Sequence, residues 1–253
     1  MIEVQGLSRR FVQGRGARQR VVQAVDDLSF GAPDACITGL LGSNGAGKTT
    51  TLRMVAGLLR PDAGRVAVGG FDVATQPSQA QSVLGLLGDA RGLYPRLTAR
   101  ENIVYYGRLH GMGLEAANAR AEALADALEM RPLLDRRTAG FSQGERMKTA
   151  LARALVHDPS HIVLDEPTNG LDVVATRALR ATLRRLCDER GLCIVVSTHV
   201  MQEVERLCDQ VVVMAGGRAV AHDTVAGLRA ATGAADLEQA FVQLAFGPQE
   251  QGR

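Results

Sequence analysis

The chain has 253 residues, of which 46% are hydrophobic and 22% charged, an ordinary globular composition. This excludes a disordered or fibrous protein, and the length is enough for a substantial buried core in one large domain or two modest lobes. The 29 basic residues are balanced by 27 acidic ones. That balance argues against a dedicated nucleic-acid binder, because such proteins usually carry a basic excess on one face.

Neither the cysteines nor the N-terminal segment points to a secreted protein. The sequence has no CxxC pair, and no histidine lies near a cysteine at the spacing of metal ligands. We therefore expect buried, reduced thiols at Cys36, Cys187, Cys193 and Cys208. The N-terminal residues lack the apolar stretch of a signal peptide, and no apolar run approaches the ~20 residues that span a bilayer. We expect a soluble, cytoplasmic chain.

The first third of the chain predicts strands, a glycine-rich turn and a helix. Apolar residues alternate or cluster as they do in strands, and a helical periodicity then ends at the turn 60–64. The expected elements are strands around 2–4 and 21–30 with a loop at 13–20 between them, a buried strand at 36–41, a helix at 49–59 and a short strand around 66–68.

The rest of the chain predicts a helical lobe and then alternating strands and helices. Residues 89–140 are rich in Ala and Arg, as expected for a small helical lobe. The later expected elements are strands at 161–164, 193–196 and 211–213, a helix from Asp172 to Gly191, a helix through 200–207, and a helix with Leu237, Ala240, Phe241 and Leu244 on one face. Apolar strands separated by helices predict a parallel sheet covered on both faces.

The strongest motif lies between the strand at 36–41 and the following helix. Residues 42–49 match GxxxxGK[ST] at every fixed position, and a chance match in a chain of this length is rare. Its glycines let backbone N–H groups converge on phosphate oxygens, and the N-terminus of the helix adds a positive dipole. Lys48 can reach the β- and γ-phosphates, and the Thr49 hydroxyl is placed for Mg²⁺. We therefore predict a nucleotide-phosphate site formed by Gly42, Ser43, Asn44, Gly45, Ala46, Gly47, Lys48, Thr49 and Thr50.

Two carboxylates follow the buried strand at 161–164. Open α/β sheets bind ligands at the carboxyl ends of their strands. Asp165 is therefore a candidate for holding Mg²⁺, and Glu166 for polarising the water that attacks the γ-phosphate. A solvated strand end would explain this pair if it stood alone. Its combination with the phosphate loop favours the catalytic interpretation.

Residues 141–145 begin a predicted helix and permit two compatible interpretations. Ser142 and Glu145 form an S-x-x-E capping box. Ser142 and the N–H groups after it can also present a second anion-binding helix N-terminus.

His199 ends another predicted strand. A lone histidine is usually structural, but this one is expected at the same edge of the sheet as the phosphate site. An imidazole there can donate a hydrogen bond to a γ-phosphate oxygen.

Taken together, these motifs resemble the ATP-binding subunit of ABC transporters, in the family's order over about residues 1–220. Residues 42–49 are similar to Walker A, Asp165 and Glu166 to the end of Walker B, residues 141–145 to the ABC signature, residues 169–172 to the D-loop and His199 to the switch histidine. Within the family, residues 90–95 and 97–102 are most similar to sodium-efflux and drug-efflux exporters with separately encoded membrane subunits.

The signature departs from the family's usual LSGGQ at three of its five positions. Its two phosphate-facing residues are kept. The departures are Phe141, Gln143 and Glu145, and the retained residues are Ser142 and Gly144.

Two further positions differ from the family's pattern. The Q-loop glutamine is matched by Asp89, which is shorter by one methylene but can still meet Mg²⁺ or its water shell. The adenine-stacking aromatic, usually tyrosine, is matched by Phe11, which would stack without a hydroxyl.

The resemblance implies an α/β fold of the P-loop NTPase class. Its parts would be a parallel core sheet, an N-terminal antiparallel β subdomain and a helical lobe inserted at about 89–155. The ATPase domain would cover residues 1–232, and a C-terminal extension residues 233–253. The implied cofactors are ATP and Mg²⁺, with Thr49, Asp165 and Asp89 as metal ligands.

The resemblance also implies partners. Two copies, or one copy and a paralogous subunit, would face head to tail, so that ATP bound by one is completed by the other. Hydrolysis would be carried by Lys48, Glu166 and His199. The residues completing the site would be Ser142, Gln143, Gly144, Glu145 and Asp172.

A separate transmembrane permease would dock on the lobe near residues 89–108. This places the protein at the cytoplasmic face of the cell membrane as a peripheral subunit, with no nucleic acid as a partner.

Two alternatives stay open from the sequence. A soluble ABC ATPase could act on a macromolecular scaffold, although the length counts against tandem-domain forms and the charge balance against ribosome or DNA clamps. A P-loop kinase acting on a small molecule is disfavoured by the signature and the D-loop.

Overall fold

The structure is a computed structural model that describes residues 1–14, 19–88 and 92–247. These residues include a six-stranded sheet in the order β10-β9-β3-β8-β7-β6. Its neighbouring strands are parallel except for β9 and β10. The strands are β3 (Cys36–Gly42), β6 (Leu84–Leu87), β7 (His161–Asp165), β8 (Cys193–Thr198), β9 (Gln210–Ala215) and β10 (Arg218–Asp223). The predicted parallel core sheet is confirmed.

An antiparallel sheet lies over one face of the core, as the resemblance implies. Its order is β2-β1-β4-β5, with β1 at Ile2–Gln13, β2 at Arg20–Ala32, β4 at Ala63–Val68 and β5 at Phe71–Asp72. Helix α1 (Lys48–Val55) packs against both sheets, since Leu52 shares one apolar cluster with Leu28 of β2 and Val163 of β7. Burial of these side chains holds the two sheets together.

Helix α1 is shorter than the predicted helix at 49–59. It ends at Val55, and Gly57 adopts a φ of 70°, in the left-handed region that terminates helices. Leu59 still packs against the core from the turn that follows. The apolar spacing therefore continues beyond the helix, which explains why the sequence predicted a longer helix than the structure has.

The other face of the core sheet is covered by α6 (Val173–Arg190) and α7 (Met201–Leu207). The N–H of Ala175 donates to Oδ1 of Asp172 at 2.7 Å, and α6 ends at Gly191 with a φ of 64°. Both ends of this helix confirm the sequence-based prediction. Such a cap contributes about 1 kcal/mol.

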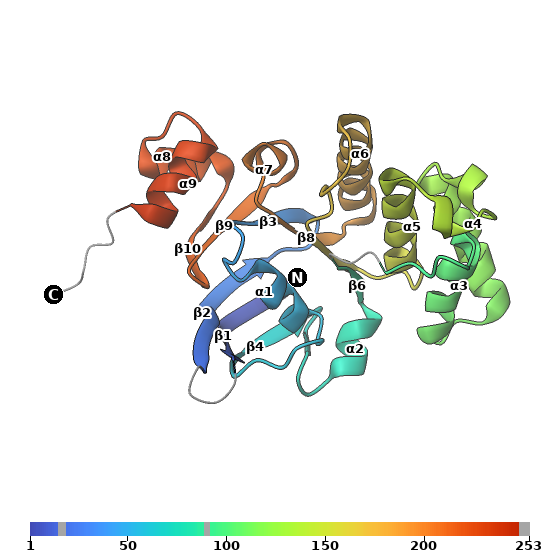
Figure 1. Ribbon diagram of the computed structural model, residues 1–253, viewed down its shortest axis with the longest axis horizontal. Coiled ribbons are helices and arrows are strands. Elements are labelled where there is room, and N and C mark those ends of the chain that lie inside the picture. Colours follow the sequence, from blue (N-terminus) through green and yellow to red (C-terminus); the bar gives the residue numbers. More distant parts are fainter. Residues whose placement is uncertain (15–18, 89–91, 248–253) are drawn as a thin grey trace.

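Apart from α2, the remaining helices lie at the two ends of the molecule (Figure 1). One end is a lobe that contains α3, α4 and α5, and the other contains α8 and α9. Leu237 and Phe241 of α9 share an apolar cluster with Leu41 of β3. The bounds are α2 at Pro77–Ser82, α3 at Ala99–Leu109, α4 at Leu114–Ala127, α5 at Gln143–Leu155, α8 at Val225–Thr232 and α9 at Leu237–Phe246, with short 3₁₀ turns η2 at Arg131–Leu133 and η3 at Thr138–Gly140.

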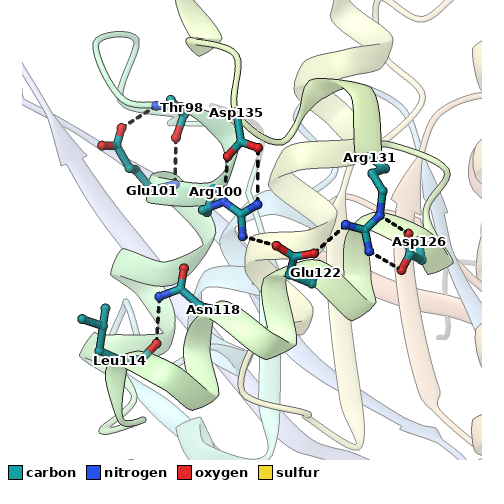
Figure 2. A network of polar contacts seen from close by, with 9 residues as sticks. All are labelled: Thr98, Arg100, Glu101, Leu114, Asn118, Glu122, Asp126, Arg131 and Asp135. Atoms are coloured by element: carbon teal, nitrogen blue, oxygen red, sulfur yellow. Dashed lines mark hydrogen bonds and ion pairs between the residues drawn. The ribbon is translucent and has the colours of Figure 1, made fainter.

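A network of alternating charges ties the lobe together (Figure 2). Arg100 of α3 pairs with Asp135 at 2.7 Å and with Glu122 of α4 at 2.6 Å. Glu122 also pairs with Arg131, which in turn pairs with Asp126. Connected ion pairs of this kind stabilise more than isolated surface pairs do. The network therefore fixes α3, α4 and the segment after α4 relative to one another.

The four cysteines are free, as predicted. Three of them are buried and Cys208 is partly buried. Within residues 1–14, 19–88 and 92–247, none of the helices has both the length and the apolar character that crossing a bilayer demands.

The sequence analysis did not predict strands β5, β6 and β10 or helices α2 and α8. Strand β6 has only four residues and includes Gly85, which is disfavoured in strand interiors. A Cβ on Gly85 would lie 2.4 Å from the carbonyl oxygen of Ala154 in α5. The glycine is therefore required by the close approach of α5 to the edge of the sheet.

We expect the substitution Gly85→Ala to lower the free energy of unfolding by about 1–3 kcal/mol, because backbone atoms must move to admit the methyl group. Urea denaturation followed by circular dichroism measures this change. Gly140→Ala is the matched control, since a Cβ there meets no described heavy atom within 4 Å. Equal stability of the two variants would show that α5 shifts without cost.

Candidate functional site

The glycine-rich loop connects the end of β3 to the start of α1. Gly47 has a φ of 99°, and a Cβ on it would lie 2.3 Å from the carbonyl oxygen of Ala24. A Cβ on Gly42 would lie 2.6 Å from the carbonyl oxygen of Met214. Both positions therefore require glycine. The loop leaves the first N–H groups of α1 available to a phosphate.

Lys48, the first residue of α1, is 5% exposed. Its Nζ donates to the carbonyl oxygens of Gly42 at 2.7 Å and Ser43 at 3.2 Å. The same nitrogen lies 3.3 Å from Oε1 of Glu166. A buried charge needs such partners, so the ammonium is held in place by groups from two different strand ends.

Asp165 and Glu166 stand at the end of β7, beside the end of β8. Asp165 is 4% exposed, and the hydroxyl of Ser197 donates to its Oδ1 at 2.5 Å. The N–H of Glu166 donates to the same hydroxyl oxygen at 2.9 Å. Ser197 therefore connects the backbone of one carboxylate residue to the side chain of the other.

Glu166 adopts a backbone conformation that few non-glycine residues take. Its φ is 45°, in the left-handed region, which costs on the order of 1–3 kcal/mol and persists only where the surroundings hold it. Its Oε2 lies 2.9 Å from Nδ1 of His199. The carboxylate thus lies between the ammonium of Lys48 and the imidazole of His199, where it can accept a proton from a bound water.

Lys48, Glu166 and His199 share one cleft of about 440 Å³. It lies at the carboxyl ends of β3, β7 and β8 and is closed on one side by strands of the antiparallel sheet. The sequence analysis assigned nine of its lining residues to the nucleotide site, placed one in the D-loop and missed three from β2. Those assigned to the nucleotide site are Phe11, Asn44, Gly45, Gly47, Lys48, Thr49, Thr50, Glu166 and His199; the D-loop residue is Asn169, and the missed ones are Val22, Gln23 and Ala24.

Phe11 lies on β1 at the wall of this cleft. The guanidinium of Arg9 stands 5.2 Å from the centre of its ring, a cation–π contact. The ring is therefore in a position to stack on a base whose phosphates occupy the loop, and that role stays a prediction. Asp89, expected at the Q-loop position, lies outside the described residues.

Residues 142–145 form the predicted capping box at the start of α5. The N–H of Glu145 donates to the Ser142 hydroxyl at 3.2 Å, and the N–H of Ser142 donates to Oε2 of Glu145 at 2.7 Å. This backbone N–H holds the pKa of the Glu145 carboxyl below its usual range. Ser142 itself is exposed to solvent. The local interpretation is confirmed, and the role of this helix end toward an anion stays a prediction.

A second cleft of about 470 Å³ adjoins the first. Gln143 of α5 lines it together with Glu166, Asn169 and Gly170. Glu166 and Asn169 belong to both clefts. The start of α5 and the loop after β7 therefore flank the same carboxylate, whereas Asp172 caps α6.

Ser197 is a further residue of the site to which the sequence analysis gave no role. It lies one strand away from Asp165, and β7 and β8 place these two residues directly opposite each other. The available signal was a polar side chain near the carboxyl end of a largely apolar strand, where Ser197 is the fifth residue of β8 as Asp165 is the fifth of β7.

Comparison with known proteins gives one family. Residues 25–169 match the family model described as ABC transporter. The chain is 41% identical over 243 residues to the ABC transporter ATP-binding protein NatA of Bacillus subtilis (strain 168), covering 96% of this chain and 97% of that protein. It is 42% identical over 197 residues to the Nod factor export ATP-binding protein I of Burkholderia lata, covering 78% of this chain and 64% of that protein.

Solved structures share the fold. A structure described as the ATP-binding subunit of an ABC transporter matches with a TM-score of 0.81 and 28% identity, covering 96% of this chain and 98% of that one. A dimeric ATP-binding cassette in a post-hydrolysis state, bound to ADP and Pi, matches with a TM-score of 0.79 and 21% identity. The match covers 88% of this chain and 98% of that one.

We expect Ser197→Ala to lower the free energy of unfolding by about 1–3 kcal/mol, because a buried carboxylate and a buried N–H lose their shared partner. Urea denaturation measures the loss. Ser82→Ala removes an exposed hydroxyl that donates to its own helix and should change stability by less than about 0.5 kcal/mol. A Ser197→Ala protein as stable as the wild type would mean that the hydroxyl does not hold the two strand ends together.

Proposed function

Because this chain belongs to the ABC transporter family and is an ATP-binding, ATP-hydrolysing subunit, we propose that it powers an exporter of the sodium-efflux or drug-efflux type. The observation that carries the proposal is the Glu166 carboxylate held between Lys48 and His199 at the phosphate loop. The name of the Nod factor export relative and the resemblance of residues 90–95 and 97–102 support export.

In the proposed nucleotide site, the loop at 42–50 holds the phosphates of ATP and Phe11 stacks on the adenine. Thr49 and Asp165 offer a hydroxyl and a carboxylate oxygen, the hard donors that Mg²⁺ prefers, with Asp89 as a third by sequence. When bound, Mg²⁺ supplies neutralisation of the phosphate charge. Ser197 fixes the orientation of the Asp165 carboxylate through its 2.5 Å hydrogen bond.

In the proposed hydrolysis step, Glu166 accepts a proton from the water that attacks the γ-phosphorus. Lys48, now donating to two loop carbonyls, donates to phosphate oxygens once ATP is bound. His199 is 44% exposed at the mouth of the cleft, so its ring can orient the carboxylate and reach a γ-phosphate oxygen. The constrained backbone of Glu166 fixes the direction of its side chain before the substrate arrives.

We infer that the site is completed by a second copy or a paralogous subunit placed head to tail. In a symmetric dimer, the exposed start of α5, with Ser142 and Gly144, would face the phosphates held by the other copy. Two apolar side chains beside Asp172 support an interface there, since Val173 and Val174 are 82% and 79% exposed.

We predict that Glu166→Gln binds ATP but lowers the rate of hydrolysis by about 10²–10⁴, because the amide cannot accept the proton. Phosphate release measures the rate, and size-exclusion chromatography with ATP should show this variant as a dimer. Glu205→Gln, on the exposed side of α7, should keep the wild-type rate. A Glu166→Gln protein with near-normal ATPase activity would remove Glu166 from the role of base.

The double variant with Ser142→Arg and Glu166→Gln tests dimerisation independently of ATP binding. We expect ATP still to bind to the monomer while the dimer is lost, because a large charged side chain then blocks the start of α5. A dimer that persists in the double variant would contradict the head-to-tail arrangement.

The proposed membrane partner docks on the lobe. Four exposed apolar side chains lie there, which we call the lobe patch: Tyr94 (45% exposed), Tyr105 (43%), Leu109 (64%) and Leu114 (59%). Exposed apolar groups gathered on one part of a surface are typical of a protein contact. A separate permease that covers the lobe patch would hold this subunit at the cytoplasmic face of the membrane.

We predict that Leu109→Glu reduces recovery of a polytopic partner by about tenfold or more when the tagged protein is captured from gently solubilised membranes, because a charge at the interface is desolvated without a partner. Mass spectrometry of the captured proteins measures this recovery. Leu58→Glu, at a leucine that is 65% exposed outside the lobe, is the control. Capture of a soluble scaffold alone would favour a scaffold ATPase and overturn the transport proposal.

A further inference from the structure

Three potential metal ligands meet at the opposite edge of the core sheet from the nucleotide cleft. Asp34 lies in the turn between β2 and β3, His161 is the first residue of β7 and Cys193 the first residue of β8. One ligand atom from each lies within 4.8 Å of the other two, and no other such group of three or more occurs among the described residues. The register of β7 and β8 places His161 and Cys193 opposite each other.

The imidazole of His161 turns its lone pair toward this cluster. Its Nδ1 lies 3.3 Å from the carbonyl oxygen of Val83, and a carbonyl only accepts, so this contact favours the tautomer with the proton on Nδ1. The hydroxyl of Ser160 also contacts Nδ1, at 2.9 Å. This leaves Nε2 unprotonated and directed at Asp34, the arrangement in which histidines bind metal ions.

The cluster already holds a positive charge. The amino group of Met1 lies 2.5 Å from Oδ1 of Asp34 and 3.1 Å from Nε2 of His161. An ammonium group only donates, so this contact independently places the lone pair on Nε2. Nε2 and Oδ1 of Asp34 are themselves 3.4 Å apart. Around a tetrahedral Zn²⁺ with bonds of about 2.0–2.3 Å, ligand atoms are separated by roughly that distance.

We propose that Asp34, His161 and Cys193 form a Zn²⁺ site that joins the turn before β3 to the first residues of β7 and β8. Imidazole nitrogen, thiolate sulfur and carboxylate oxygen are the donors from which zinc sites are built. Three protein ligands leave the fourth position to water. The ion enters from the Asp34 side, whose carboxylate is 65% exposed, and displaces the Met1 ammonium by charge repulsion.

Binding requires a proton to leave the cluster. The Cys193 thiol, fully buried, donates to the carbonyl oxygen of Ala32 at 3.3 Å and therefore still carries its proton. On binding, the Sγ–H bond breaks, the proton passes to solvent and the sulfur forms the bond to Zn²⁺. Because the ligands come from separate parts of the chain, only the folded protein holds the ion, and Zn²⁺ should stabilise the fold.

Zinc binding can be measured on the full-length protein without nucleotide, after chelator treatment, by competition with a chromophoric chelator. We expect one Zn²⁺ per chain. At a free concentration about one hundred times Kd, the Tm should rise by about 5–10 °C. Replacing Zn²⁺ with Co²⁺ should give the ultraviolet charge-transfer band of a thiolate ligand. Absence of one-to-one binding tighter than about 10 µM in the wild type overturns the proposal.

Variants then test the ligands one by one. Cys193→Ala and His161→Gln should weaken Zn²⁺ binding by about 100-fold, and Cys187→Ala, a buried thiol of α6 outside the cluster, should leave it unchanged. Asp34→Asn changes only an exposed turn residue, so it folds even if the two buried variants do not, and it should weaken binding by about tenfold. Unchanged affinity in Asp34→Asn, a cobalt spectrum without the thiolate band, or an equal loss in Cys187→Ala each overturns the site.

Discussion

The register of β7 against β8 is the constraint on which the nucleotide site depends. It places Asp165 opposite Ser197, so that one hydroxyl holds a buried carboxylate and the backbone of Glu166 together. β8 also lies between β7 and β3, the strand that leads into the phosphate loop. Lys48 reaches across it to Glu166. A slip of one residue in this register would turn the polar groups away from the cleft.

Two helix caps stabilise this chain at positions where we propose that a second copy binds. The Ser142 and Asp172 side chains accept hydrogen bonds from the first turns of α5 and α6, which stabilises both helices in the single chain. Ser142 is itself exposed, and Asp172 is followed by two exposed valines, Val173 and Val174. A second copy that covered these ends would therefore meet helices that are already formed, and binding would cost little ordering of the chain.

Ion pairs and hydrogen bonds connect the helices of the lobe to one another. Arg100 and Arg131 connect its segments through carboxylates, as Figure 2 shows. Arg153 of α5 is 7% exposed, donates to the carbonyl oxygen of Gly92 at 2.8 Å and covers the ring of Tyr106. The segment that leaves the core sheet toward the lobe is thus attached to two of the lobe's helices.

The sequence by itself determined the phosphate loop, the acidic strand end, the caps at Ser142 and Asp172 and the parallel class of the sheet, because each depends on residues within a few positions of one another. The tertiary structure alone decided the role of Ser197, the existence of β6 and the meeting of Asp34, His161 and Cys193. Spacing along the chain excluded a cysteine–histidine site, yet strand pairing brings the two residues together. Contacts between distant segments follow from packing, which local patterns do not encode.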